Sequence, residues 1–491
     1  MKNQVSLYPR GFIFSDEAPA KLLNTYEQIN IIDKFYYSYD INLESNVLVK
    51  DDKFIIIHGE YLHVGIDYQF TQSGLLNNLL DFYFNDYKLF LDVLDYISGR
   101  YVIIIGDHQE VMVFPDASNT RTTYFSLDKN LISSHVYLIQ DQFKHEKSEY
   151  IFDLPDLNNG LMNTPFENIK SMVPNHNLNF YTREVKRFFP RENNKFVNYT
   201  EDEKFELIER FWKEQLKYYF SKYENFIFSI TGGGDSRFSL ALLKEHLDKV
   251  QFFTYSRVKG EDNSSYAGKI LTLDYKIVSQ MLEDINLNHK FMHFVDDKKE
   301  LSPTMKNILS RNTIGQHSSF LIPHVQDNYP QDNLKHIRGN LLEIGKTRYY
   351  SQVYKESNMQ ELKKVFDNQY KKTKKEDALD YVENTYYKFV NDLNYGKDTY
   401  DYHLLDLYHW EIRMGRWHPE ILNTHDIAFD TLSPFNHRAL IDISLSFSYE
   451  KRRNEYMFNE IINRNYPILN FYGDNNLLNL YEQWRDMNYK N

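Results

Sequence analysis

Cysteine is absent from the 491 residues of the chain. Its absence excludes a disulfide framework, a thiolate metal site, an iron–sulfur cluster and a cysteine nucleophile, and it fits a reducing compartment. Long apolar runs are also missing: the longest, such as Tyr101–Ile105, are far shorter than the roughly 20 residues that cross a bilayer. Residues 1–19 have no apolar stretch behind basic residues, which predicts that they are not a signal peptide. We therefore expect a soluble cytoplasmic protein with no membrane contact.

Positive charge is in the minority, with 57 Lys and Arg against 69 Asp and Glu and a formal net charge of −12. This balance argues against a protein dominated by nucleic-acid backbone binding, which needs a basic face, so we expect no nucleic-acid partner. It leaves room for a local basic pocket that binds phosphate. Apolar residues at 42% and charged residues at 26% exclude a largely disordered, collagen-like or coiled-coil protein. The length allows two or three domains of about 150 residues each.

The first part of the chain contains short alternating segments between turn residues, the pattern of half-buried strands. An amphipathic helix is predicted over Leu75–Phe90, with Leu76, Leu79 and Leu80 on one face. This region is therefore predicted to be α+β with a mostly antiparallel sheet. The predicted strands are Phe54–His58, Tyr61–Tyr68, Tyr101–Gly106, Val111–Pro115 and Asn130–Ser134.

The pattern changes near residues 185–205, where the polar segment Arg187–Val197 indicates a linker. Thr200 and Glu203 then form a capping box, which predicts a helix to about Lys222. Beyond it, apolar runs, turns and helices alternate, as in a doubly wound α/β domain, and the chain from Tyr402 on is helical. The predicted strands are Phe226–Ile230, Gln251–Tyr255 and His336–Arg338, and the predicted helices are Arg237–His246, Tyr275–Asn286 and Thr304–Ser310.

The most informative segment is Phe226–Leu243, in which a buried strand runs through Thr-Gly-Gly-Gly-Asp-Ser into an amphipathic helix. Three successive glycines let the backbone approach a ligand closely, and the amides at the start of a helix bind phosphate. The hydroxyls of Thr231 and Ser236 can donate to phosphate oxygens, and Asp235 fits a ligand for Mg²⁺ carried by pyrophosphate. The alternative is a glycine-rich turn in which Asp235 and Ser236 serve as the helix N-cap. The chain lacks the lysine of a Walker A loop here.

Thr231–Ser236 resembles the SGGxDS loop of the asparagine synthetase-like ATP pyrophosphatases, with threonine in place of the first serine. Four further regions resemble that family in the right order, so the resemblance covers about residues 200–465. They are Phe252–Ser256 on the second strand, Arg338–Glu343 in the acid-rich loop, Glu411–Met414, and Ser433–Asn436 in the late Pro-Phe motif.

The first part resembles the class II glutamine amidotransferase domain of the same family through Gly99–Ile103, Pro115–Arg121, Thr123–Phe125 and Leu131–Ser134. The resemblance implies two domains. Residues 1–190 are expected to form an α+β sandwich of the Ntn-hydrolase type. Residues 200–491 are expected to form an α/β adenine-nucleotide hydrolase-like (PP-loop) domain with a helical C-terminal region.

The departures from the family define the expected function. Lys2 stands where glutamine-using members have the nucleophilic cysteine, so glutaminase activity by that route is excluded. The resemblance then implies the chemistry of β-lactam synthetase and lasso-peptide cyclases, which join a carboxylate to an amine that is not released from glutamine. We expect an ATP- and Mg²⁺-dependent ligase that adenylates a small-molecule or peptide carboxylate, releases pyrophosphate and transfers the acyl group to an amine. The amine is either on the same molecule or on a second one.

The resemblance also implies the site residues. Asp235 and Glu343 are expected to hold Mg²⁺. The residues expected to bind the nucleotide are Thr231, Gly232, Gly233, Gly234, Asp235, Ser236, Tyr255 and Gly339. For Glu343 the alternative is a surface or ion-paired residue. The family's late lysine is missing, because no lysine follows Pro467 before Lys490. Lys346, Arg348 and Tyr349, just after the acid-rich loop, are therefore the catalytic candidates.

Three weaker expectations complete the sequence-based description. A non-catalytic nucleotide-binding or scaffold protein is the alternative function, favoured by the altered acid-rich loop and opposed by the intact glycine loop. The first domain is a candidate surface for a homodimer. Trp410, Trp417 and Trp484 are expected to pack in the core or between helices rather than to stack on a base.

Overall fold

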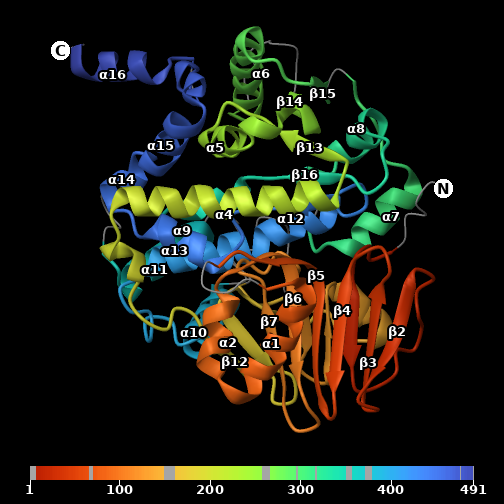
Figure 1. The fold of residues 1–491 in the computed structure, drawn as a ribbon. Coiled ribbons are helices and arrows are strands. Elements are labelled where there is room, and N and C mark those ends of the chain that lie inside the picture. The colour runs from red at the N-terminus through yellow and green to blue at the C-terminus, as the bar shows by residue number, and fades with distance from the viewer. Residues whose placement is uncertain are drawn as a thin grey trace.

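The computed structural model describes residues 7–65, 70–148, 161–256, 266–294, 297–315, 318–349, 356–370, 379–475 and 477–489. Lys2 and Lys490 lie outside the described residues. The molecule has two parts, which Figure 1 shows one above the other: an antiparallel sandwich in red and orange, and a parallel sheet in green with helices around it. The long helix α4 (Glu201–Lys222) crosses between them.

The sandwich consists of two six-stranded antiparallel sheets. Phenylalanine, isoleucine and valine side chains from both sheets, among them Phe14, Phe54 and Ile104, form the core between them. The first sheet has the order β10 (Ile169–Ser171), β8 (Tyr124–Ser126), β9 (Leu131–Ser133), β1 (Phe12–Ser15), β3 (Phe35–Asp40), β2 (Tyr26–Ile31). The second has the order β12 (Val185–Arg187), β11 (His176–Asn179), β7 (Val111–Pro115), β6 (Ile97–Gly106), β5 (Lys53–His63), β4 (Ser45–Lys50).

The helices α1 (Gln72–Asn85) and α2 (Tyr87–Leu94) pack on the outer face of the second sheet, and α3 (Val136–Gln142) follows β9. The predicted helix Leu75–Phe90 is therefore wrong as a single element. The chain breaks at Asp86, which leaves the helical conformation and whose carboxylate accepts a hydrogen bond from the Leu89 N–H (3.0 Å) to cap the second helix. A local cap thus overrides the continuous apolar stripe.

The strands Phe54–His58 and Tyr61–Tyr68 were predicted as two elements around a turn, and this is wrong: β5 is one strand. Residues 66–69 lie outside the described residues. Gly59 is not a turn residue but a point of close approach. Its φ is +116°, and a Cβ there would lie 2.2 Å from the Arg100 carbonyl oxygen. Strands β1 to β4 were not predicted.

The second sheet system is parallel throughout, with the order β15 (His289–His293), β14 (Val250–Ser256), β13 (Phe226–Ser229), β16 (Lys335–Ile337), β17 (Asp430–Leu432). The predicted strands at 226–230, 251–255 and 336–338 are confirmed within two residues. Strand β17 was missed because only three residues form it, within a region that was predicted to be helical from Tyr402 on.

The capping box of α4 is confirmed, since the Thr200 hydroxyl accepts from Glu203 N–H and the Glu203 side chain accepts from the Thr200 N–H. The three other predicted helices of this region are present with longer or shifted bounds. The remaining helices are α5 (Gly234–Leu242), α6 (Tyr266–Asp284), α7 (Pro303–Asn312), α8 (Leu321–Asn328), α9 (Met359–Tyr370), α10 (Leu379–Asp392), α11 (Leu404–Tyr408), α12 (His418–His425), α13 (Arg438–Leu445), α14 (Tyr449–Arg453), α15 (Tyr456–Asn465) and α16 (Leu480–Tyr489).

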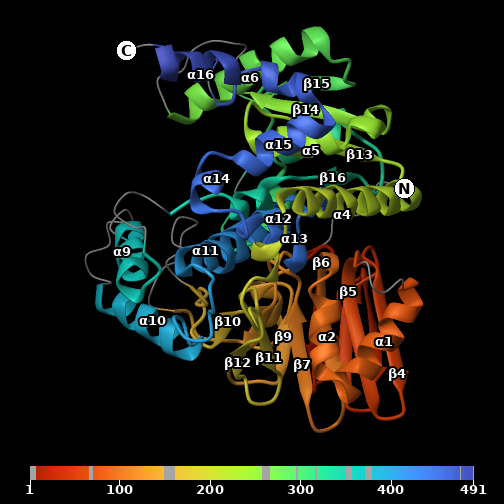
Figure 2. The same ribbon diagram turned by 60° about the vertical axis from the view of Figure 1, so that its left-hand side comes forward.

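The described residues also contain the 3₁₀-helical segments η2 (Lys195–Asn198), η3 (Lys244–Lys249), η4 (Asn340–Gly345) and η7 (Pro467–Phe471), and the π-helical segment η6 (His409–Trp417). The tryptophan prediction holds for Trp410, which is fully buried, and fails for Trp484, which is 48% exposed on α16. Figures 1 and 2 show α16 at the outer edge of the molecule. None of the described helices is long and apolar enough to cross a membrane.

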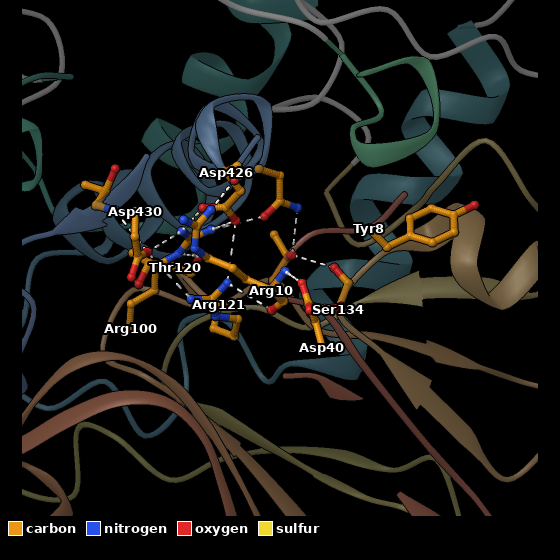
Figure 3. A network of polar contacts seen from close by, with 12 residues as sticks. Tyr8, Arg10, Asp40, Arg100, Thr120, Arg121, Ser134, Asp426 and Asp430 are labelled. Atoms are coloured by element: carbon orange, nitrogen blue, oxygen red, sulfur yellow. Dashed lines mark hydrogen bonds and ion pairs between the residues drawn. The ribbon is translucent and has the colours of Figure 1, made fainter. Parts of the chain in front are cut away.

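A buried ion network joins the two parts (Figure 3). Arg100 on β6 binds both carboxylate oxygens of Asp426 (2.6 and 2.9 Å) and lies 3.4 Å from Asp430 on β17. Arg121 lies 3.5 Å from Asp426, and Lys335 on β16 binds Asp430 (2.8 Å). Burial alone would raise the pKa of the Asp430 carboxyl, but these surrounding cations hold it well below its usual range.

Replacement of Arg100 should test this network. Arg100→Met leaves two buried carboxylates with fewer cations, and an uncompensated buried charge typically costs about 3–5 kcal/mol. We expect the free energy of unfolding, measured in urea, to fall by that amount. Lys50→Met, which removes an exposed ion pair with Asp81, should change it by less than about 1 kcal/mol. Equal losses in the two variants would contradict the structural role given to Arg100.

Candidate functional site

The glycine-rich loop lies where successive strands of the chain change the direction in which they are added to the parallel sheet. Strand β13 is central, β14 lies on one side of it and β16 on the other, and all three run in the same direction. Residues Thr231–Gly233 leave the carboxyl end of β13 and lead into α5, which begins at Gly234. In open α/β sheets, ligands bind at this topological switch point because the adjoining loops diverge to opposite faces.

The two hydroxyls of the loop bond to each other and to the backbone. The Ser236 Oγ accepts from the Thr231 N–H (3.1 Å), and the two side-chain oxygens are 3.0 Å apart. Outside the loop, Asp274 on α6 accepts from the Gly232 N–H (2.8 Å). Thr231 and Ser236, predicted as phosphate donors, therefore hold the shape of the loop in this structure.

The loop after β16 packs directly against the start of α5. A Cβ on Gly339 would lie 2.7 Å from the Ser239 Oγ and 2.9 Å from the Asp235 carbonyl oxygen. Glycine at this position allows the contact between the two elements. The contact places the acid-rich segment η4 beside the first turn of α5, and so brings the glycine-rich and acid-rich motifs together.

The two motifs line a cleft of about 580 Å³. Its lining contains seven of the predicted residues, and Glu455, Arg453 and Asn475 from the C-terminal region complete one side of it. The cleft therefore combines a helix N-terminus with several carboxylates and several cations. The predicted residues in its lining are Thr231, Gly233, Gly234, Asp235, Glu343, Lys346 and Arg348.

Lys346 connects two carboxylates in the cleft. Its Nζ lies 2.9 Å from Asp235 Oδ1 and 3.0 Å from Glu455 Oε2, and over the ring of Phe458. Burial raises the pKa of the Asp235 carboxyl, and Glu343 raises it further while Lys346 opposes the shift. Burial alone would lower the pKa of Lys346, but the two carboxylates raise it well above its usual range. Lys346 is thus charged in the cleft.

Glu343 faces cationic and neutral groups. Its Oε2 lies 3.6 Å from Arg348 Nη1 and 3.9 Å from His409 Nε2, and it is buried without accepting a hydrogen bond. Burial, together with Arg348 and Arg413, holds the pKa of His409 well below its usual range, so this imidazole is neutral. Arg348 is therefore the cation that pairs with Glu343 in this structure.

The other predicted residues lie outside the lining of the cleft. Gly232 and Ser236 support the loop from within, and Gly339 lies under Asp235. The ring of Tyr349 lies against His409, 5.4 Å between ring centres, and Tyr255 lies on β14. Sequence reasoning missed Asp274, Glu455 and Asn475, which lie 38 to more than 200 residues from the loop and carry no local pattern that marks them.

Two segments that carried the family resemblance meet at the interface between the two parts. The Asn436 side chain donates to Asp116 Oδ1 (2.8 Å) and to the Gly99 carbonyl oxygen (2.6 Å). The Asp116 carboxylate also accepts from the N–H groups of Thr120 (2.9 Å) and Arg121 (2.8 Å). These residues therefore act in domain packing and not at the cleft.

No protein-family model and no curated protein matches the chain. Among solved structures, one similar chain is glutamine phosphoribosylpyrophosphate amidotransferase from B. subtilis, complexed with ADP and GMP. The identity is 9%, the TM-score is 0.26, and the match covers 60% of this chain and 88% of that one. A second, described as the allosteric regulatory enzyme of purine biosynthesis, shows 11% identity, a TM-score of 0.25, and coverage of 68% and 90%. Scores this low carry no argument about fold or activity.

Asp274 offers a pH test of the loop. Burial raises the pKa of its carboxyl to about 6, although the hydrogen bond from the Gly232 N–H opposes the shift. Because this value lies above that of the unfolded chain, the carboxyl contributes stability that is fully present below about pH 4 and is lost as the pH rises through about 6. Asp274→Asn removes the titration and keeps an oxygen that can accept from Gly232.

We expect the free energy of unfolding of Asp274→Asn, relative to wild type, to increase by about 2–3 kcal/mol between about pH 4.5 and 7.5. Urea unfolding at several pH values measures this difference. Asp248→Asn, at an exposed position of η3, is the matched control and should run parallel to wild type. Parallel profiles for Asp274→Asn as well would show that this carboxyl titrates normally.

Proposed function

We propose that the protein is an ATP-dependent ligase that forms an amide bond, with formation of AMP and pyrophosphate. The observation that carries the proposal is the glycine-rich loop at the switch point of a parallel sheet, opening into a cleft that Asp235, Glu343 and Lys346 line. A helix N-terminus with free amides favours an anion, and the flanking cations favour a multiply charged one. ATP fits this combination.

The chain's own residues divide the binding task. Gly233 and Gly234 leave the backbone of the loop accessible for phosphate oxygens, while Asp274 and Ser236 keep it in shape. Lys346, Arg348 and Arg453 supply positive charge to the lining of the cleft. Positioning and charge neutralisation are the main contributions that an enzyme makes to phosphoryl and nucleotidyl transfer.

Asp235 and Glu343 are the residues that would hold Mg²⁺. Both line the cleft, Glu343 raises the pKa of Asp235, and Glu343 Oε2 is a buried oxygen that accepts no hydrogen bond. Among the described residues no cluster of three histidine or acidic side chains has metal-binding geometry. Mg²⁺ is commonly bound by one or two carboxylates together with phosphate oxygens and water, so this donor set fits. The ion would polarise the phosphate and stabilise the leaving pyrophosphate.

In the proposed reaction a carboxylate oxygen of the substrate attacks the α-phosphorus of ATP, and the bond to the β-phosphate oxygen breaks. The amine nitrogen then attacks the acyl carbon, AMP leaves with the bonding electron pair, and the nitrogen loses a proton. Lys346 and Arg348 are placed to offset negative charge in these steps. The amine comes from the same molecule or from a second substrate.

A non-catalytic nucleotide-binding or scaffold role is the second candidate. The observation in its favour is the ion pair between Lys346 and Asp235, which neutralises the carboxylate without any metal. The two functions differ in their need for Mg²⁺, and nucleotide binding distinguishes them.

Calorimetric titration with α,β-methylene ATP tests the proposal. We expect binding that Mg²⁺ strengthens, and we expect Asp235→Asn to lose at least about tenfold in affinity with Mg²⁺ present. Without Mg²⁺ the same variant should bind the analogue as well as wild type or better, because a negative charge near the phosphates is gone. Asp248→Asn, in the same half of the molecule but outside the lining, should behave as wild type.

Two outcomes would contradict the ligase proposal. Binding that neither Mg²⁺ nor Asp235→Asn alters would support the scaffold role. Absence of binding at millimolar nucleotide would mean that the cleft does not accept ATP. Where binding follows the expectation, release of pyrophosphate from ATP in the presence of candidate carboxylates and amines identifies the substrates.

A further inference from the structure

A second, larger cavity lies at the open edge of the sandwich, away from the glycine-rich loop. Strands β10 and β12 are edge strands of the two sheets, and residues of both strands and of α10 line the cavity. Figure 2 shows α10 beside these strands. The cavity has a volume of about 830 Å³, within the range of small-molecule sites. The cavity has an apolar lining from both sheets and from α10, which consists of Phe125, Met162, Val185 and Phe389.

Lys170 on β10 brings a cation into this cavity. Its Nζ donates to the side-chain oxygen of Asn163 (2.8 Å), and no carboxylate among the described residues forms an ion pair with it. Burial, with a smaller contribution from Lys388, lowers the pKa of the Lys170 ammonium to about 8, while the carboxylates of Glu167 and Asp392 oppose the shift. A half-buried ammonium whose partner is a neutral amide is a favourable site for an anion.

Arg183, in the turn between β11 and β12, brings a second cation. Its Nη1 donates to the Tyr181 carbonyl oxygen, while its Nε is buried and has no hydrogen-bond partner. It forms no ion pair with a described carboxylate, and its φ of +59° places it in a conformation that non-glycine residues seldom adopt. Arg183 therefore contributes to the lining a positive charge that no described carboxylate neutralises.

The other charges of the cavity are balanced within it. Lys186 pairs with Glu184 (2.9 Å), and Lys388 lies 3.9 Å from Asp392. Lys170 and Arg183 therefore leave the lining with two positive charges in excess, beside an apolar wall. This separation of charge and apolar surface is the pattern of a site for an amphipathic anion.

We propose that this cavity binds an amphipathic organic anion, with a carboxylate or phosphate-monoester head at Lys170 and Arg183 and an apolar body against Phe389 and its neighbours. The site is independent of the nucleotide cleft and does not rest on the proposed ligase activity. Its ligand is either an acid with an apolar chain or a phosphorylated lipid-like molecule, which share this chemistry.

Calorimetry on the full chain with octanoate, octyl phosphate and octanol tests the site. We expect one binding site, at least about tenfold tighter for an anion than for octanol, since an ion pair with two partly buried cations separates these probes. Preference for octanoate or for octyl phosphate identifies the head group. We expect affinity for octanoate to fall above about pH 8, where Lys170 loses its charge.

Lys170→Met and the double variant Lys170→Met/Arg183→Gln should lower the affinity for the anion at least about tenfold and leave that for octanol unchanged. Lys213→Met, which removes an exposed lysine of α4 outside the cavity, should bind as wild type. As a measurement that needs no variant, the bound anion should protect Lys170 from reductive methylation, read by mass spectrometry. Equal binding of octanol, unchanged binding in the double variant, no protection of Lys170, or no binding of any probe at millimolar concentration would overturn the proposal.

Discussion

The buried pairing of Arg100 with Asp426 and Asp430 is the constraint on which the arrangement of the molecule depends. Arg100 belongs to a central strand of the sandwich, and Asp430 begins the last strand of the parallel sheet. Asp430 also binds Lys335 at the start of β16. Ion pairs thus connect the sandwich through β17 to β16. The segment that follows β16 carries Glu343, which lines the cleft. Buried carboxylates need such cations, so separating the two parts would expose an unbalanced charge on either side.

That arrangement gives the first part a role that needs no nucleophile. Asp116 collects hydrogen bonds from its own loop and from Asn436, and Trp410 donates to the Ala117 carbonyl oxygen (2.8 Å). The segments that resemble an amidotransferase therefore form the surface on which the second part is built.

The sequence allowed prediction of features that a short stretch of chain determines. A buried strand, three glycines and a helix follow one another at Phe226–Leu242, so the loop could be recognised without knowledge of the fold. Glu455 and Asn475 reach the same cleft from more than 200 residues away, and only the packing of α15 and η7 against α5 brings them there. The role of Asn436 was equally hidden: its residue type was noticed, but its partners lie in another sheet. The prediction that Trp484 packs in the core or between helices was wrong, because an apolar side chain alone does not reveal whether other residues cover it.

The charge balance of the cleft explains why Lys346 and Asp235 occur together. Asp235 alone at a helix N-terminus would compete with a phosphate for the same amides, and its burial makes the free carboxylate costly. The ammonium of Lys346 offsets that cost while the cleft is free of ligand. In the proposed reaction Lys346 would then act twice: it first balances Asp235, and it becomes available to phosphate oxygens once another cation engages that carboxylate. Glu455 at the start of α15 holds the ammonium in place between these two roles.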